Sequence, residues 1–590
     1  MSMRRYTNSF NTRKTPQSEP IPGREKDMAK NNAGGFDFKI DKWSQLDRFL
    51  ILGTESGSYY ASSKKMTADN AKVALDCVAE DGVRVVNRVV EISQSGRAPK
   101  NDPALFVLAL CLKLGDDNTR AAARAAVPKV ARIGTHLFHF ADAIEAFGGW
   151  GRGTRKAISE WYTRRSPSAV AFQAVKYAQR DGWSHRDLLR LAHVKPPSDE
   201  HNKVFRYIAK GWPGVGELPP GDGTDIIWAA EKAKAIGNEG APNGARTKEI
   251  VRLITDHNLP RECIPTQYLN EIGVWEALLD NGGRGMPMTA MIRNLPKMTS
   301  IGLLEQNSHR KAVVDALGNE EALRKARVHP LSVLVALKTY GSGHGVRGKL
   351  AWSPVPKVVD ALDGAFYKSF GSVTPTGKRV MLALDVSGSM CSPEISGMPG
   401  ITPRIGSVAM AMVTAAVEDD VHCIGFTSQG GLLDGHARLV ADALSNYYGG
   451  SGKLKGFWQS PGSRGDYGYG VSELDISPRR RLDDNINSIS NLPFGGTDCA
   501  LPMLYAKANK IPVDAFLVFT DSETWHGQVH PTQALDQYKQ AMGIDAKLIV
   551  VGMTSTGFSI ADPARKDMLD VVGFDVAAPN IMSAFVRGEF

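Results

Sequence analysis

The sequence predicts a multidomain protein, in which an all-α array of helical pairs precedes an α/β domain of the doubly wound type. The chain has 590 residues, which exceeds the size at which a single hydrophobic core keeps growing. From Trp43 to about Phe370, apolar residues recur at three- and four-residue spacing, as in amphipathic helices. After residue 379, the apolar runs VMLALD, VHCIGF, AFLVFT and KLIVVG, which are typical of buried strands, alternate with helical runs, and this is the pattern of an α/β domain.

The composition indicates a cytoplasmic protein without a membrane anchor. Hydrophobic residues make up 42% of the chain, charged residues 23%, and no apolar run approaches the roughly 18 residues that a membrane span needs. The first 27 residues are polar and basic and lack the apolar core of a secretion signal. No two cysteines are spaced as CxxC, so the sequence indicates neither a zinc cluster nor a disulfide framework.

Charge is distributed unevenly along the chain. Residues 380–590 contain 15 Lys and Arg against 23 Asp and Glu, a net charge of −8, whereas residues 1–379 carry 56 against 39, a net charge of +17. A positive excess of this size favours a polyanionic partner through attraction to phosphates, although charge alone does not distinguish RNA from DNA or a membrane surface.

The predicted domains follow from these patterns. Residues 1–35 combine basic and polar residues with proline and few large apolar residues, so we expect a disordered basic tail. Residues 36–376 form the helical domain, in which Thr119 and Ser184 are predicted to begin helices, Ser184 with Asp187 at capping-box spacing. Residues 377–590 form the α/β domain, and its Gly/Tyr/Ser-rich stretch at 428–480 is predicted to be a surface insertion.

A candidate metal site lies in the α/β domain. The run VMLALD ends at Asp385, and Ser387 and Ser389 follow it directly; Thr497 precedes a predicted helix, and Asp521 follows the strand run AFLVFT. Ligands of doubly wound folds gather at this edge of the sheet, and hard oxygen donors suit Mg²⁺. The ordered set resembles the metal-ion-dependent adhesion site (MIDAS) of von Willebrand factor A domains. The alternative is that the carboxylates cap helices and the serines line a tight turn.

The helical part, read together with this domain, resembles the TROVE module of the Ro autoantigen family. The resemblance rests on many separate segments, including ARIGTHLFHF, WGRGTRKAISEWY, KYAQRDGWSHRDLLRLAHVKP, HPLSVLVALKTYGSGHGVRGKLAW and DPARKDMLDVVGFD. It implies a ring of HEAT-like helical repeats beside a Rossmann-like von Willebrand A domain. It also implies binding of small Y RNAs on the outer surface and of single-stranded 3′ ends of misfolded RNA in the ring opening, as a monomeric factor in RNA quality control.

Two sets of basic residues are candidates for RNA contacts. Lys176 and Arg180 are four residues apart, so on a helix they would lie on one face, and His193 follows the next predicted helix. These three match the Y RNA contact positions of the family, whereas the alternative is a solvated basic face. The second set interleaves with Phe138, Phe140, Trp150 and Trp161, which either stack on single-stranded bases or belong to the core. Its members are Arg132, His136, Arg152 and Arg155.

No catalytic motif is evident, so the prediction is a binding protein rather than an enzyme. The segment from Gly343 to Lys349 satisfies a glycine-rich phosphate-loop pattern only in part, because Leu350 replaces the required Ser or Thr. The family resemblance implies a 3′→5′ exoribonuclease as a partner tethered through the RNA. The alternative function is a metal-dependent protein-binding scaffold without RNA cargo.

Overall fold

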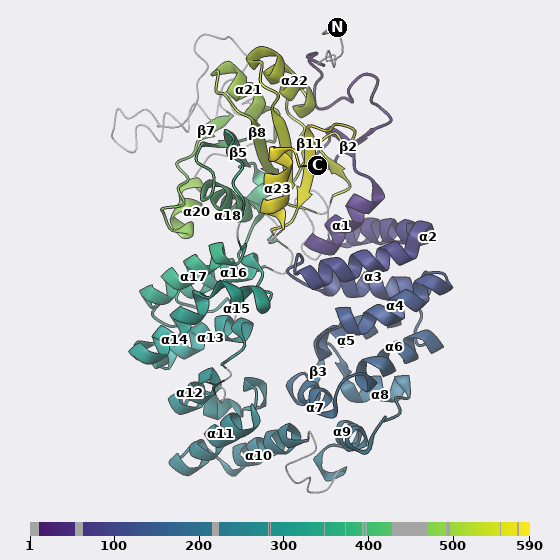
Figure 1. Cartoon of the computed structure of the whole chain (residues 1–590), viewed down its shortest axis with the longest axis vertical. Helices are drawn as coiled ribbons and strands as arrows, with labels where there is room; N and C mark the ends of the chain where they lie inside the picture. Colours follow the sequence, from purple (N-terminus) through teal and green to yellow (C-terminus); the bar gives the residue numbers. More distant parts are fainter. Residues whose placement is uncertain are drawn as a thin grey trace. The chain divides into compact units, whose positions relative to one another are not determined.

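The computed structural model divides the chain into two compact units, each described by itself below (Figure 1). Unit 1 consists of Met1–Asn70 and Phe370–Phe590, and unit 2 of Ala71–Ser369. The structure describes residues 11–53, 63–214, 224–280, 283, 285–346, 349–371, 373–391, 394–395, 398–427, 470–490, 496–554, 556–574 and 577–589. Among these residues, no helix has the length and apolar character required to cross a lipid bilayer.

Unit 2 is built from helices with one short hairpin, as predicted. Its elements are α2 (Ser63–Ser95, beginning in unit 1), α3 (Asp102–Leu114), α4 (Asp117–Val130), α5 (Gly134–Ala146), α6 (Arg152–Thr163), α7 (Pro167–Lys176), β3 (Gln179–Arg180), β4 (Trp183–Ser184), α8 (His185–Ala192), α9 (Asp199–Lys210), η1 (Trp212–Gly214), α10 (Asp225–Glu239), α11 (Gly244–His257), η2 (Arg261–Cys263), η3 (Thr266–Asn270), α12 (Ile272–Asp280), α13 (Met288–Ser300), η4 (Leu303–Glu305), α14 (Asn307–Leu317), α15 (Glu320–Lys325), α16 (Pro330–Gly341) and α17 (Pro356–Lys368).

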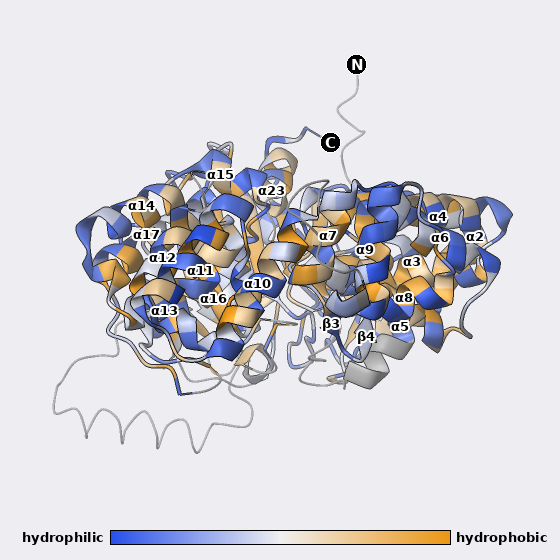
Figure 2. Ribbon diagram, turned by 90° about the horizontal axis from the view of Figure 1, so that it is seen from below, coloured by the Kyte–Doolittle hydropathy of each residue, from blue (hydrophilic) through white to orange (hydrophobic). Residues whose placement is uncertain are grey.

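Successive helices of unit 2 pack against near neighbours in the sequence. The packed pairs include α3 with α4 and α5, α4 with α6, α10 with α11, and α16 with α17. Hydrophobic residues lie on the faces that these helices turn toward one another, and hydrophilic residues on their outer faces (Figure 2). This is the stacking of helical pairs that the apolar periodicity predicts.

The structure tests two helix starts that were predicted from local sequence signals. Ser184 caps α8 through a complete capping box with Asp187, as predicted. Thr119 does not begin its helix: Asp116 caps α4 and accepts from the Thr119 amide at 2.8 Å. Thr119 instead packs against Gly82, where an added Cβ would lie 2.2 Å from its hydroxyl oxygen. The position therefore serves contact between helices rather than capping.

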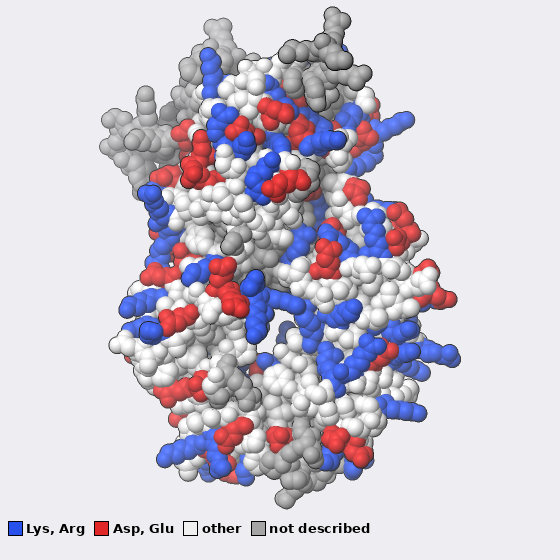
Figure 3. All heavy atoms as spheres, viewed as in Figure 1, with Lys and Arg blue, Asp and Glu red and all other residues white. Residues whose placement is uncertain are grey.

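The last helices of unit 2 return to its first ones. Nε2 of His329, at the start of α16, lies 3.3 Å from the carbonyl oxygen of Arg97, which follows α2. His329 is buried, and Arg327 is close enough to Arg132 to lower the pKa of its guanidinium, beyond the larger effect of burial. The helical array therefore curves back on itself within unit 2. In the view of Figure 3, the surface of the helical unit has a hollow, with Lys and Arg side chains at its border.

Unit 1 contains a six-stranded sheet with the order β11-β9-β8-β5-β6-β7. All neighbouring strands are parallel except β6 and β7. The strands are β5 (Val380–Asp385), β6 (Val421–Phe426), β7 (Val471–Glu473), β8 (Ala515–Thr520), β9 (Lys547–Gly552) and β11 (Met568–Val572). Four of them, β5, β6, β8 and β9, coincide with the predicted strand runs. β7 lies inside the stretch predicted as an insertion, so the C-terminal end of that stretch belongs to the sheet.

Helices cover both faces of this sheet, as in a doubly wound fold. α21 (Leu501–Ala508) and α22 (Pro531–Met542) share one hydrophobic core with Met381, Phe516 and Val550 of the sheet. α18 (Pro403–Ala415) packs on β5 and β8, and α23 (Ala578–Arg587) packs on β11. The remaining elements are α1 (Lys42–Leu52), η5 (Gly388–Cys391) and α20 (Leu482–Ser490).

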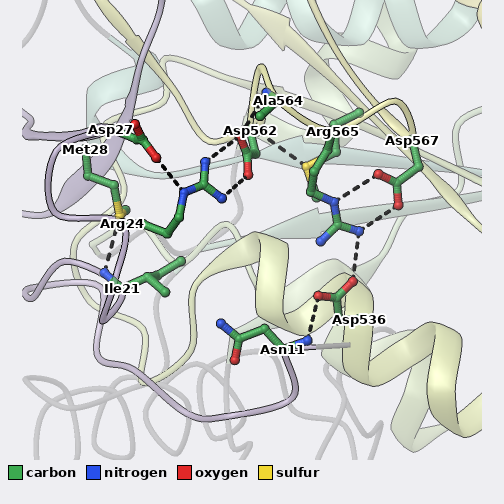
Figure 4. A network of polar contacts seen from close by, with 11 residues as sticks. Asn11, Ile21, Arg24, Asp27, Met28, Asp536, Asp562, Ala564, Arg565 and Asp567 are labelled. Atoms are coloured by element: carbon green, nitrogen blue, oxygen red, sulfur yellow. Dashed lines mark hydrogen bonds and ion pairs between the residues drawn. The ribbon is translucent and has the colours of Figure 1, made fainter. Parts of the chain in front are cut away.

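The N-terminal segment differs from the prediction of a disordered tail over residues 1–35. From Asn11 onward it lies on the α/β domain, where β1 (Met28–Lys30) and β2 (Phe36–Lys39) form an antiparallel sheet with β10 (Phe558–Ser559). Figure 4 shows Arg24 donating to both oxygens of the buried Asp562, at 2.6 and 2.9 Å. Within this segment Ile21, Met28 and Phe38 form a small buried apolar cluster, and polar contacts such as that of Arg24 with Asp562 hold the segment to residues more than 500 positions away.

The two compact units divide the chain at Asn70 and not at residue 36, where the sequence predicts the helical domain to begin. β2 and α1 were assigned to the helical domain, but both belong to unit 1. Arg48 of α1 is 1% exposed and pairs with both carboxylate oxygens of Asp570 in β11 at 2.5 Å. Its other guanidinium nitrogen donates to the carbonyl oxygens of Thr556 and Phe558. This buried ion pair fixes α1 to the edge of the sheet.

Candidate metal centre and nucleic-acid interface

The carboxylates of the predicted metal site lie at neighbouring strand ends. β5 and β8 are adjacent and parallel, with Leu384 opposite Phe519. Asp385 is the last residue of β5, and Asp521 is the first residue after β8. Because both strands end at the same edge of the sheet, their carboxylates come close together although the sequence separates them by more than 130 residues.

Hydroxyl groups surround the Asp385 carboxylate. One of its oxygens accepts from the Ser387 amide at 2.9 Å, and the other accepts from the Thr520 hydroxyl at 2.7 Å. The hydroxyl oxygens of Ser387 and Ser389 are 3.0 Å apart. Asp385, Ser387, Ser389 and Asp521 are each at most 3% exposed. The D-x-S-x-S spacing therefore gathers the oxygen donors that it predicts.

Burial and mutual repulsion both oppose ionisation of the two carboxylates. Burial raises the pKa of Asp385 above its ordinary value. The pKa of Asp521 is raised further, mainly by burial and then by the negative charge of Asp385. Arg404, in the first turn of α18, carries a positive charge that lowers the pKa of Asp385. Its guanidinium also donates to the Val386 and Ser387 carbonyl oxygens. A bound cation would relieve the remaining repulsion.

Thr497 completes the set of possible ligands. It is fully buried, and among the described atoms its hydroxyl has no hydrogen-bond partner. A buried polar group without a partner is costly, and a metal ligand is one role that explains it. The described residues contain no metal-binding group of three or more His, Cys, Asp or Glu side chains. Two carboxylates with three hydroxyls are a donor set that fits Mg²⁺, which takes few protein carboxylates and keeps several waters.

The N-terminal segment forms a second layer behind this site. The buried Glu523 carboxylate accepts from the Asn32 side-chain amide at 2.8 Å and from the Ala33 backbone amide at 3.1 Å. Gln17 donates to Asp498, next to Thr497, at 2.8 Å and accepts from the Thr524 hydroxyl. One segment thus ties together the two loops that bear Thr497 and Asp521.

The first basic set lies on α7, the β3–β4 hairpin and α8, but not as predicted from its spacing. α7 ends at Lys176, so Lys176 and Arg180 do not share a helical face. Arg180 lies instead in β3, because Asp181 and Gly182 adopt positive φ angles of 50° and 82° and turn the chain into a hairpin. Gln173 of α7 accepts from the Gly134 amide at 2.8 Å and so holds α7 against α5.

The three members of this set are accessible to different degrees. The Arg180 side chain is 64% exposed. His193 is exposed at the C-terminus of α8, where it adopts a left-handed conformation with φ of 51°. Lys176 is half-buried, and its ammonium lies 5.3 and 5.5 Å from the ring centres of Phe172 and Tyr177. All three belong to one continuous stretch of 18 residues, which presents positive charge to solvent.

The second basic set divides into two parts. Arg132 donates to the carbonyl and hydroxyl oxygens of Ser93 at 2.9 and 2.8 Å, and is therefore engaged within the protein. Burial lowers the pKa of His136 to about 4, so this residue is neutral at pH 7 and offers hydrogen bonds rather than charge. Arg152 and Arg155 are exposed in the first turns of α6.

The structure shows which of the four aromatic residues near the second basic set belong to the core, a question that the sequence left open. Phe138, Phe140 and Trp161 are fully buried, so they belong to the core and cannot stack on a nucleobase. Trp150 is half-buried and packs against Trp183, with ring centres 6.0 Å apart. The helical spacing of the buried three was the correct signal for core residues.

Sequence reasoning missed Arg404 and Glu523 beside the metal site. A signal for Arg404 existed, because it is an arginine at the start of the otherwise apolar run IGSVAMAMV. Glu523 could have been suspected from its place two residues after Asp521. The N-terminal partners Gln17 and Asn32 had no local signal, since only the tertiary fold brings them to the site.

Comparison with known proteins agrees with both halves of the molecule. The Ro60 vWA domain model matches residues 379–439 and 466–586, and the TROVE domain model matches residues 29–213 and 252–340. The chain is 39% identical to RNA-binding protein RO60 of Deinococcus radiodurans over the full length of both. It is 34% identical to RNA-binding protein RO60 of Caenorhabditis elegans, over 95% of this chain and 90% of that one.

A solved structure supports the same relationship. The crystal structure of the Deinococcus radiodurans RO (RSR) protein superposes with a TM-score of 0.64 at 39% identity, covering 93% of this chain and 100% of that chain. Two family models, full-length relatives and a similar fold thus point the same way. The chain belongs to the Ro60 family, with a TROVE domain followed by a Ro60-type von Willebrand A domain.

Proposed function

We propose that this protein binds RNA and acts in RNA quality control or processing. A small structured, Y-like non-coding RNA binds the outer surface formed by α7, the β3–β4 hairpin and α8, through Lys176, Arg180 and His193. Single-stranded 3′ ends of misfolded RNA enter the hollow of unit 2, and the exposed Arg152 and Arg155 of α6 are candidates for contacts with this RNA. Two relatives that match nearly the whole chain are both named RNA-binding proteins, which supports this proposal.

The observation that carries the proposal is the exposure of cationic side chains on a rigid element. Arg180 is held in a two-residue strand, and its side chain is 64% exposed. Contacts to phosphates need such accessible charges, and they position an RNA without reading its sequence. RNA shape and the accessibility of unpaired ends would then select the cargo.

The protein acts in this proposal by binding and not by cleaving RNA. Degradation of the RNA would be carried out by a 3′→5′ exoribonuclease that is tethered through the bound structured RNA. The separation of tasks is consistent with the relatives, which are named for RNA binding.

We further propose that Asp385, Ser387, Ser389, Thr497 and Asp521 hold one Mg²⁺. The unpartnered Thr497 hydroxyl and the two facing buried carboxylates support this site. The ion would neutralise the carboxylates and provide an open position for an acidic group of a protein partner. A protein partner held in this way should dissociate on addition of EDTA, whereas RNA should dissociate as salt rises.

The RNA proposal is tested by comparing two RNA ligands. The double variant Lys176→Ala/Arg180→Ala should weaken binding of a stem-loop RNA about tenfold or more, because two phosphate contacts are lost. A short single-stranded oligonucleotide should bind this variant nearly as well as it binds the unaltered protein. Lys232→Ala/Lys234→Ala, which removes two exposed charges from α10, is the matched control. Equal losses for both RNAs would reject two separate binding sites.

A further inference from the structure

The β3–β4 hairpin places an arginine directly beside a tryptophan. Its register pairs Arg180 with Trp183 and Gln179 with Ser184. Residues that lie directly opposite each other in an antiparallel pair point to the same face, with Cβ atoms roughly 5 Å apart. The exposed side chain of Arg180 and the indole of Trp183 therefore leave the hairpin on the same face, and Nε of Arg180 lies 3.4 Å from the Asp181 carboxylate in the turn.

Contacts with α5 fix the indole of Trp183 in place. Its N–H donates to Asp142 at 3.3 Å, and its ring packs against Trp150 at 6.0 Å with an interplanar angle of 42°. Trp150 in turn donates its indole N–H to Glu145 at 2.8 Å. The polar edge of each indole is thus occupied by a carboxylate of α5, while both rings remain half-buried.

This pair differs from the structural tryptophans of unit 2. Trp161 and Trp275 are fully buried, and their N–H groups donate to backbone carbonyl oxygens. An indole that only filled the core would be covered in the same way. Trp183 instead keeps part of its ring at the surface, next to a cation that can hold a phosphate.

We propose that Trp183, backed by Trp150, is a stacking platform for an unpaired nucleobase of the RNA whose phosphate Arg180 contacts. The inference rests on the proposed function and adds a second kind of recognition to the same surface. Base stacking on an aromatic ring tolerates any sequence, and it requires a base that is not enclosed in a duplex. This surface would then favour RNA with an unpaired base beside a stem over a fully paired stem.

The test uses two hairpin RNAs that differ only in an internal loop. One carries unpaired adenines in the loop, with 2-aminopurine at one position, and the other is fully paired. Trp183→Leu should weaken binding of the looped RNA about tenfold and leave binding of the paired RNA unchanged. Trp183→Phe, which keeps a ring, should retain most of the affinity. Trp228→Leu is the matched control, since Trp228 is also half-buried and packs on a histidine, but on α10.

The salt dependence of RNA binding shows whether Trp183 stacks on a base or only supports Arg180. Arg180→Ala should lower both the affinity and the slope of log K against log salt, by about one unit of slope. Trp183→Leu should lower the affinity without changing the slope, because stacking releases no counterions. If the slope falls as much in Trp183→Leu as in Arg180→Ala, Trp183 only positions Arg180, and the proposed stacking on Trp183 is wrong.

Fluorescence of the RNA gives a readout that needs no variant. The 2-aminopurine emission should fall when the unaltered protein binds the looped RNA, since stacking quenches it. Unchanged emission on saturation would overturn the inference while leaving RNA binding intact. If the unaltered protein binds neither RNA at low salt, the proposed function fails, and the platform fails with it.

Discussion

His139 of α5 bridges two carboxylates from different elements, Asp102 of α3 and Asp181 of the hairpin turn. Its Nε2 lies 3.0 Å from Asp181, and its Nδ1 faces Asp102. The hydrogen bond with Asp102, together with both carboxylate charges, raises the pKa of His139 above the ordinary 6.5. When it is protonated, the imidazole therefore fastens the hairpin that carries Arg180 to the helical body.

This bridge predicts a pH-dependent stability. Because the folded pKa of His139 lies above its unfolded value, its contribution is complete below about pH 6.5 and is lost as pH rises through the folded pKa. His139→Gln should lower the free energy of unfolding by about 0.5–1 kcal/mol at pH 6 and by less at pH 9, given the partial exposure of the site. Urea unfolding at both pH values measures this. Asp102→Asn should remove most of the same pH dependence, and an equal loss at both pH values would contradict the prediction.

The proposed metal site predicts that substitution of its ligands removes Mg²⁺ binding. Calorimetric titration should show one site in the unaltered protein and none in Asp385→Ala, because the central carboxylate is gone. Thr497→Val should weaken binding about tenfold, since one hydroxyl ligand is lost. Thr414→Val is the control, because its buried hydroxyl donates within α18 to the Met410 carbonyl oxygen. Undiminished binding by Asp385→Ala would remove the assignment.

The N-terminal segment predicts a coupling between position 17 and the metal site. Gln17 is fully buried and bridges Asp498, Val529 and Thr524. Gln17→Ala should lower the free energy of unfolding by about 2–3 kcal/mol, because several buried polar groups lose their partner. It should also weaken Mg²⁺ binding, since the loops of Thr497 and Asp521 lose their common tie. Lys26→Ala, an exposed change in the same segment, should leave both measurements unchanged.

The buried ion pair of α1 predicts a large effect from a single substitution. Arg48→Met leaves the carboxylate of Asp570 without its partner, so we expect a loss of about 3–5 kcal/mol in the free energy of unfolding. Chemical unfolding followed by circular dichroism measures it. The double variant Arg48→Met/Asp570→Leu should recover a large part of this loss, because two apolar side chains replace the pair. No recovery would mean that the backbone carbonyl contacts of Arg48 matter more than its charge.

The sequence by itself determined the elements that have a local signal. The four predicted strand runs appear as β5, β6, β8 and β9, because strands in a parallel sheet covered by helices on both faces read as nearly continuous apolar runs. The capping box of Ser184 and Asp187 begins α8 through contacts that span three residues. The metal-site motif likewise places its serines close to Asp385 in the chain, so their gathering needed little tertiary information.

Only the tertiary structure decided what depends on distant partners. Residues 11–41 assemble only a small apolar cluster of their own, and they are also held by buried polar contacts with remote segments, such as Gln17 with Asp498 and Asn31 with Thr524. The four-residue spacing predicted that Lys176 and Arg180 lie on one helical face. In the structure the helix ends at Lys176, and the turn at Asp181 pairs Arg180 with Trp183. Hydrophobic periodicity reports what a segment buries, whereas hydrogen bonds and ion pairs between remote segments leave no periodic trace in the sequence.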